Sequence, residues 1–248
     1  MTGRENIEQI TKSSEKTKVD QGLRKYMSQV YNYMTTGLLM TAFVGFLVAN
    51  TPVQNLFFSQ VAVDGGYATT LSFLGFIAIL SPLILVFLIN PMLARGQVKA
   101  AFGMFMLFSA LFGVSLASIL LTYTGISITR IFLVTAGMFA AMSLYGSTTH
   151  RDLTSLGSFL LMGLIGVILA VVVNFFLRSP VLYYTCTIIG VFIFIGLAAY
   201  DTQRIKRAYA TTDGTSIMHS KAILGALALY LDFINLFFML VSLFGDRR

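Results

Sequence analysis

Long stretches without a single charged residue constrain this chain more than any other feature of its sequence. Four of them cover residues 26–63, 65–94, 100–129 and 153–177, and each exceeds the ~20 apolar residues that span a bilayer as a helix. Only 11% of the 248 residues are charged and 56% are hydrophobic, so too few charges remain to cover a water-facing surface. A soluble globular protein is excluded, and we predict an all-α, polytopic membrane protein.

Seven apolar segments alternate with short connections that are rich in turn residues. The predicted spans lie near residues 30–49, 69–89, 101–121, 128–146, 157–177, 181–200 and 222–244. The short connections indicate one compact bundle. Residues 1–25 contain six basic and four acidic side chains and no apolar core. We therefore predict a largely disordered cytoplasmic tail at 1–25, followed by a seven-helix transmembrane domain at 26–248.

The distribution of lysine and arginine between alternate connections predicts the orientation. If all seven segments cross, 13 basic residues lie on the side of the N-terminus and 4 on the other side. The N-terminus is therefore predicted to be cytoplasmic. If the seventh segment is re-entrant instead, Arg247 and Arg248 change sides and the bias becomes 15 to 2, so charge alone leaves both topologies open.

Several other classes of site and partner are not expected. The net charge of +7 would suggest a nucleic-acid partner in a soluble chain, but no basic residue interrupts the apolar runs to build a binding face. Cys186 stands alone, which excludes a disulfide framework and a thiolate metal site. No nucleotide motif is present, and the seventh span has no lysine for a retinal Schiff base, so no cofactor is predicted. His150 and His219 are interpreted as solvated loop residues.

Two aspartates need an explanation in such an apolar chain. Asp201 falls at the cytoplasmic end of the sixth span and Asp232 near the middle of the seventh. A carboxylate at a helix centre costs roughly 2.5–3.5 kcal/mol on insertion scales, so each is expected to face the bundle interior or water. Two antiparallel helices joined near residues 215–217 would place both at similar depth. Asp201 alone has an equally plausible structural role, which is to pair with Arg204 one turn later.

Other polar residues lie close to the aspartates. Asn235 follows Asp232 by three residues and so shares its helix face. Tyr200 and Tyr230 each lie near an aspartate in the sequence and can donate a hydrogen bond to it, although tyrosines near helix ends commonly anchor the bilayer interface. Because two carboxylates in a poorly solvated bundle cannot both ionise easily, we expect them to share a proton. Elsewhere, Gly137 and Ala141 form a small-residue pair that permits close helix approach.

Two motifs contain the aspartates, AYDTQRIK at residues 199–206 and GALALYLDFINLF at residues 225–237. Together they resemble the paired signature of the Bax inhibitor-1 family, the transmembrane Bax inhibitor motif proteins. Further similarity to bacterial members lies at residues 23–34 and 143–153, so that the resemblance runs from about residue 22 to the end. It implies six helices around a central seventh and a bacterial inner-membrane location.

The resemblance also implies a function. In some members the two aspartates gate a pH-sensitive calcium leak, so Asp201 and Asp232 are the expected gate and transient calcium ligands. A basic residue on the second helix can latch the pair in the family, and the nearest candidate here is Arg95, which is expected in the loop beyond Pro91. An alternative hypothesis is that the protein regulates a membrane protease or a stress response by binding a partner through its N-terminal tail, as in some bacterial relatives.

An intramembrane aspartyl protease is a third, remote possibility, since its two aspartates share one proton. Such proteases place a Gly-x-Gly sequence before the second aspartate, whereas this chain has Leu229, Tyr230 and Leu231 there. We therefore expect no enzymatic activity, with a passive cation leak as the leading hypothesis.

Overall fold

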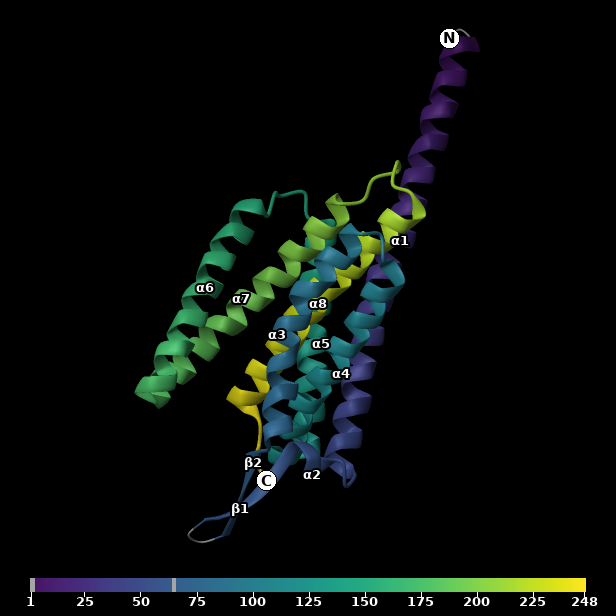
Figure 1. Ribbon diagram of the computed structural model, residues 1–248. Helices are drawn as coiled ribbons and strands as arrows, with labels where there is room; N and C mark the ends of the chain where they lie inside the picture. The colour runs from purple at the N-terminus through teal and green to yellow at the C-terminus, as the bar shows by residue number, and fades with distance from the viewer. Residues whose placement is uncertain (1–2, 64–65) are drawn as a thin grey trace.

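Seven long helices form the molecule. The computed structural model describes residues 3–63 and 66–248, and within them seven helices are long and apolar enough to cross a membrane (Figure 1). They are α1 (Gly3–Asn50, apolar from Gln21), α3 (Phe73–Ala94), α4 (Val98–Thr122), α5 (Gly125–Thr148), α6 (Thr154–Leu177), α7 (Pro180–Arg207) and α8 (Thr215–Phe244). The predicted all-α polytopic fold is confirmed.

The helix ends follow local sequence signals. The hydroxyl of Ser72 accepts the backbone N–H of Gly75 at 3.1 Å and so caps α3. Ser179 caps α7 in the same way by accepting the N–H of Leu182 at 3.4 Å, and Pro180 occupies the first helical turn, where its missing donor costs nothing. Both α7 and α8 are longer than their predicted spans because hydropathy falls at the polar ends before the helices stop.

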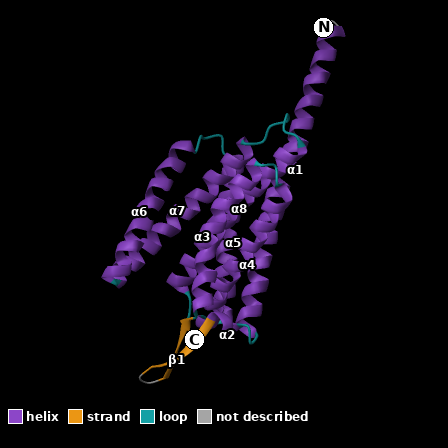
Figure 2. Cartoon of the chain, viewed as in Figure 1, coloured by secondary structure: helices purple, strands orange, loops and turns teal. Residues whose placement is uncertain are grey.

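A β-hairpin, which the sequence analysis did not predict, follows a short helix after α1. Helix α2 (Gln54–Phe57) leads into strands β1 (Phe58–Val63) and β2 (Gly66–Leu71), which pair antiparallel with Phe58 opposite Leu71 (Figure 2). The predicted span 69–89 therefore begins too early. The β-branched residues Val61, Val63, Thr69 and Thr70 favour strand over helix, and they are the signal that the apolar count overlooked.

Helix α8 is the centre of the bundle, as expected. In its most apolar stretch 56% of the residues are buried, against 6% in α6. It packs against α1, α4, α5 and α7, whereas α3 packs mainly on α4 and α6 on α7. Figure 1 shows α6 and α7 leaning together away from the other helices. The surrounding helices thus form two layers, four against α8 and two outside them.

The topology of the seventh span is also visible. Helix α8 is a single unbroken helix of 30 residues, and the two termini lie at opposite ends of the bundle (Figure 1). A helix of this length and composition is long enough to cross a bilayer, which favours seven crossings over the re-entrant alternative.

The N-terminal segment differs from the prediction of disorder. Helix α1 runs without a break from Gly3 to Asn50 and projects beyond the bundle (Figure 1); residues 1 and 2 lie outside the described residues. The first proline of the chain is Pro52, and residues 4–18 are rich in Glu, Gln and Lys, which are good helix formers. The mixed charges and the lack of an apolar core argued for disorder, but helix propensity decides the local structure.

Glycine sets the closest helix approaches. A Cβ on Gly146 of α5 would lie 2.1 Å from the carbonyl oxygen of Ala199 in α7, and one on Gly157 of α6 would lie 2.4 Å from the ring of Tyr200. A Cβ on Gly137 would meet nothing within 4 Å. The small-residue pair at Gly137 is therefore not a contact, and that interpretation is wrong.

Candidate functional site

The fold brings Asp201 of α7 and Asp232 of α8 together. Both line a cavity of about 500 Å³ between α6, α7 and α8. Asp232 is 4% exposed. The side chains that α6 presents to this cavity are all apolar: Leu161, Leu164, Val167, Ile168, Val171 and Val172. The pair thus sits where three helices meet, with little access to water.

Each aspartate carries one buried oxygen without a hydrogen-bond partner. They are Oδ1 of Asp201 and Oδ2 of Asp232, and no other buried side-chain nitrogen or oxygen among the described residues lacks a partner. Burying an unpaired polar atom is costly, so such atoms concentrate where they have a functional role. The unpartnered oxygens are therefore the strongest structural indication of a functional site.

Arg204 supplies the positive charge nearest to the pair. Its Nη1 lies 3.2 Å from Oδ1 of Asp201, which makes an ion pair but not an aligned hydrogen bond, and its side chain is 59% exposed. Its guanidinium lies 6.0 Å from the ring centre of Tyr200. This is the helical i, i+3 ion pair that the sequence predicts. Because Arg204 is largely solvated, its contribution to stability is small, and it leaves the Asp232 oxygen unpaired.

Asn235 and Tyr230 lie on different faces of α8. Asn235 lines the same cavity as Asp232, and its Nδ2 donates to the carbonyl of Leu231 at 2.9 Å. The hydroxyl of Tyr230 instead forms a hydrogen bond of 2.7 Å with Oγ1 of Thr41 in α1. The expectation that Tyr230 donates to an aspartate is wrong, because residues two apart on a helix point in opposite directions.

Two further expectations are corrected. Tyr200 neighbours Asp201 but stacks on Gly157 and beneath Arg204, and forms no hydrogen bond to either aspartate. Pro91 lies inside α3, so that Arg95 caps the end of this helix rather than lying in a loop. Arg95 is exposed and does not line the aspartate cavity, since α3 packs outside α4. The structure therefore does not place Arg95 as a latch.

Gln203 is a buried polar residue that the sequence analysis missed. Its Oε1 accepts the N–H of Leu153 at 2.9 Å, and its Nε2 donates to the carbonyl of Arg151 at 2.8 Å. These two hydrogen bonds hold the α5–α6 connection against α7, the helix that carries Asp201. An uncharged glutamine two residues after an intramembrane aspartate is the sequence signal that indicates it.

Replacing Gln203 by Leu should lower the free energy of unfolding. The change leaves the N–H of Leu153 and the carbonyl of Arg151 without partners, at a cost of about 1–3 kcal/mol. Thermal unfolding of the purified protein in detergent would measure it. Gln97→Leu, at an exposed position without a capping hydrogen bond, is the control and should be neutral; an equal effect in both variants would contradict the assigned role.

The same connection carries an exposed ion pair. Oδ1 of Asp152 lies 2.7 Å from Nη1 of Arg207. Hydrogen bonds from Thr154 and then from Arg207 lower the pKa of Asp152 to about 2. Its stabilising contribution is present above the ordinary carboxyl pKa and is lost only as the pH falls towards 2, so this pair cannot give a response near neutral pH.

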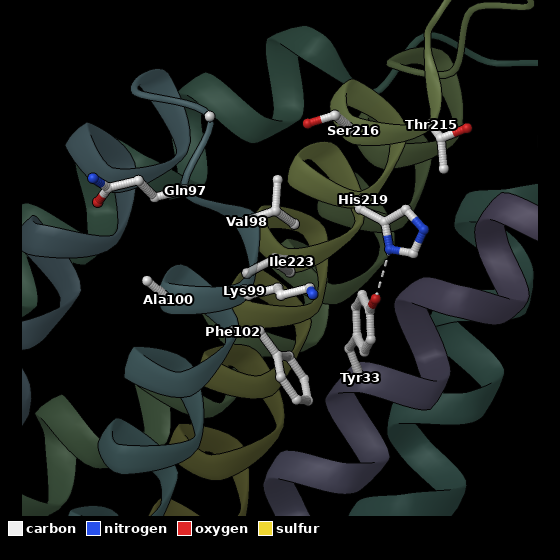
Figure 3. A pocket seen from close by; sticks show the side chains of 11 residues that line it. Tyr33, Gln97, Val98, Lys99, Ala100, Phe102, Thr215, Ser216, His219 and Ile223 are labelled. Carbon is white, nitrogen blue, oxygen red and sulfur yellow. Dashed lines mark hydrogen bonds between the residues drawn. The ribbon is translucent and has the colours of Figure 1, made fainter.

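His219 also differs from the sequence analysis, which placed it in a loop. It lies in the second turn of α8, where its Nδ1 is 2.8 Å from the hydroxyl of Tyr33 and 2.7 Å from Nε2 of Gln29, both on α1. Figure 3 shows His219 and Tyr33 at one side of a cavity of about 920 Å³ that Lys99 and Phe102 also line. The network joins α1 to the central helix.

The donor set around the aspartates suits a passing cation better than a resident one. In the described part of the chain, no group of three or more His, Cys, Asp or Glu residues is placed to hold a metal ion. Ca²⁺ takes 6–8 oxygen ligands, and two carboxyl groups offer four. Water would have to supply the remaining ligands.

Comparison with known proteins agrees with this architecture. A family model described as "Inhibitor of apoptosis-promoting Bax1" matches residues 23–248. The chain is 47% identical over 231 residues to the inner membrane protein YbhL of Escherichia coli K12, which covers 92% of this chain and 94% of that protein. It is 40% identical over 240 residues to the uncharacterized protein RP147 of Rickettsia prowazekii, covering 96% and 97% of the two chains.

The family match begins at the start of the first span and extends to the last residue. Within it lie all seven membrane-spanning helices and both aspartates of the cavity. The chain therefore belongs to the Bax inhibitor-1 family.

Proposed function

We propose that the protein is a passive, pH-sensitive leak for calcium, or for a similar hard cation, in which Asp201 and Asp232 form the gate. The observation that carries this proposal is the pair of carboxyl groups that line one cavity, with Asp232 buried and its Oδ2 without a partner, and Asp201 partly buried and paired only with the largely exposed Arg204. Ionisable groups inside a membrane protein commonly mark ion pathways. Carboxylate oxygens are the ligands that Ca²⁺ prefers.

The gate follows from the chemistry of two neighbouring carboxyl groups. When they share a proton, they form a hydrogen bond that ties α7 to α8 and closes the end of the bundle nearest the N-terminus. Loss of the proton leaves two negative charges side by side, whose repulsion loosens this contact. Among the described residues that line the cavity, Arg204 is the one other charged residue. Flux should therefore rise as the pH increases.

Calcium flux into proteoliposomes, measured as a function of external and internal pH, tests the proposal. We expect a flux that needs no energy source, rises with pH and exceeds that of protein-free liposomes. A protein that folds in the liposomes but gives the flux of empty vesicles at every pH would overturn it.

We propose that the protein lies in the bacterial inner membrane with its N-terminus in the cytoplasm. The relative YbhL is named as an inner membrane protein, and the bias of 13 to 4 basic residues supports the orientation.

Cysteine labelling in intact cells would test this orientation. A cysteine at exposed Ser59 in β1 should react with a membrane-impermeant maleimide, whereas one at exposed His150 in the α5–α6 connection should react only after lysis. The single native cysteine, Cys186, is buried and should give little background. The reverse labelling pattern would invert the topology.

The projection of α1 beyond the bundle supports a second candidate function (Figure 1). In this alternative, residues 1–25 are a cytoplasmic segment that binds a membrane protease. Deleting residues 2–20 should then abolish co-purification with the protease while leaving calcium flux unchanged. Unchanged co-purification would remove this alternative.

A further inference from the structure

A groove separates α1 from α5 at the end of the bundle that carries the N-terminus. Both helices pack against α8, yet they make few contacts with each other. The space between them is a cavity of about 820 Å³ that is lined by α1, α5, α7 and α8. A hydrogen bond between the hydroxyls of Tyr31 and Ser143 crosses it.

The lining of the groove is mostly apolar, with hydroxyl groups among it and basic residues at its mouth. Met27 and Met34 of α1, Phe139 of α5 and Phe233 of α8 supply apolar surface, and the basic side chains at the mouth are Arg24 and Lys206. No acidic side chain is among the described residues that line it. Lys206 uses one of its three donors on the carbonyl of Ser147, at 2.6 Å.

A smaller, polar cavity of about 320 Å³ adjoins the mouth. It shares Leu23, Ser147 and Lys206 with the groove and adds Gln203 and Arg207. The change from basic to apolar lining falls where the apolar part of α1 begins, at Gln21, and where α5 and α7 end. This level is the boundary between lipid headgroups and acyl chains, so the polarity of the groove follows that of a lipid monolayer.

We propose that this groove binds an anionic phospholipid. The phosphate lies against Arg24 and Lys206, and one acyl chain lies along the methionines between α1 and α5 and reaches Phe233. Basic pockets between transmembrane helices recognise anionic headgroups in this way. Unbranched, polarizable methionine side chains adapt to a flexible chain. The charge at the mouth selects this lipid over a zwitterionic one, and the apolar groove selects it over a soluble phosphate.

Lipid titration of the full-length protein, followed by native mass spectrometry from detergent, tests the proposal. Phosphatidylglycerol should bind more tightly than phosphatidylcholine with identical acyl chains, and glycerol phosphate should not bind measurably.

In the double variant Arg24→Gln and Lys206→Gln, affinity for phosphatidylglycerol should fall about 30-fold. Each basic residue near an anionic headgroup contributes ~1 kcal/mol, and 1.4 kcal/mol corresponds to a factor of ten in affinity. Lys99→Gln, which removes an exposed cation at the same end of the bundle, is the matched control and should bind as the parent does.

A second variant tests the acyl chain without changing any charge. Ala140 of α5 is exposed and lines the groove, so Ala140→Phe should fill it and weaken phosphatidylglycerol binding while thermal stability is retained. Equal affinity for the two lipids, or unchanged binding in the double variant, would overturn the proposal. Binding of glycerol phosphate as tight as that of the lipid would also overturn it, since the groove would then hold only a phosphate. The readout is binding, so its result does not depend on calcium flux.

Discussion

Replacing Asp232 by Asn is expected to remove most of the pH dependence of calcium flux. The amide has the shape of the carboxyl group and can still form a hydrogen bond to Asp201, but it cannot lose a proton to create the repulsion that opens the gate. The Asp232 side chain is 4% exposed. Because the variant buries a neutral amide in place of an ionisable carboxyl group, its fold should be retained. Flux into proteoliposomes across a series of pH values measures the change.

The matching variants distinguish a coupled gate from two independent groups. Asp201→Asn should act through the same pair, and its effect should be non-additive with that of Asp232→Asn, as for residues in direct contact. Asp213→Asn is the control, because Asp213 is a partly buried carboxylate at the same end of the bundle that pairs with Lys221 at 2.6 Å, away from the cavity. A double Asp201→Asn and Asp232→Asn variant with the parent's pH profile would show that these residues are not the gate.

Replacing Gly146 by Ala is expected to lower the free energy of unfolding by about 3 kcal/mol, at the upper end of the usual cost of overpacking. The new Cβ would lie 2.1 Å from the carbonyl oxygen of Ala199 and 2.8 Å from its carbonyl carbon. These are backbone atoms of α7, so no side chain can rotate away and the two helices must separate. Denaturant or thermal unfolding in a mild detergent measures the loss.

Gly137→Ala is the matched control on the same helix. A Cβ there meets nothing within 4 Å, and alanine favours a helix over glycine by about 1 kcal/mol. The control should therefore be neutral or slightly stabilising. If both variants unfolded alike, the close approach of α5 and α7 at Gly146 would be incorrect.

The sequence alone determined how many helices the chain forms and at what depth in the membrane their residues lie. Uncharged runs are long enough to cross a bilayer, and this length sets the number of helices, although α1, α7 and α8 extend beyond their predicted spans. The same reasoning brought Asp201 and Asp232 to one depth, because two antiparallel helices with a short connection place positions equally far from the turn side by side. Asn235 could be assigned to the face of Asp232 because helical spacing is regular.

The same regularity also contained information that the sequence analysis did not use. Tyr230 precedes Asp232 by two residues, so a helix places them on opposite faces, and the hydrogen bond of Tyr230 to Thr41 reflects this. The β-branched residues of strands β1 and β2 were likewise present in the sequence, but an apolar count over a long window hides a short strand.

Only the tertiary structure decided which helices touch and at which residues. It placed α3 outside α4 and so took Arg95 away from the aspartates, it made Gly146 rather than Gly137 the point of closest approach, and it paired His219 with α1. These contacts join residues far apart in the chain, and no local pattern specifies them. The physical reason is the solvent: in lipid, the hydrophobic effect does not favour one apolar neighbour over another, so close packing at small residues and a few interhelical hydrogen bonds choose the partners.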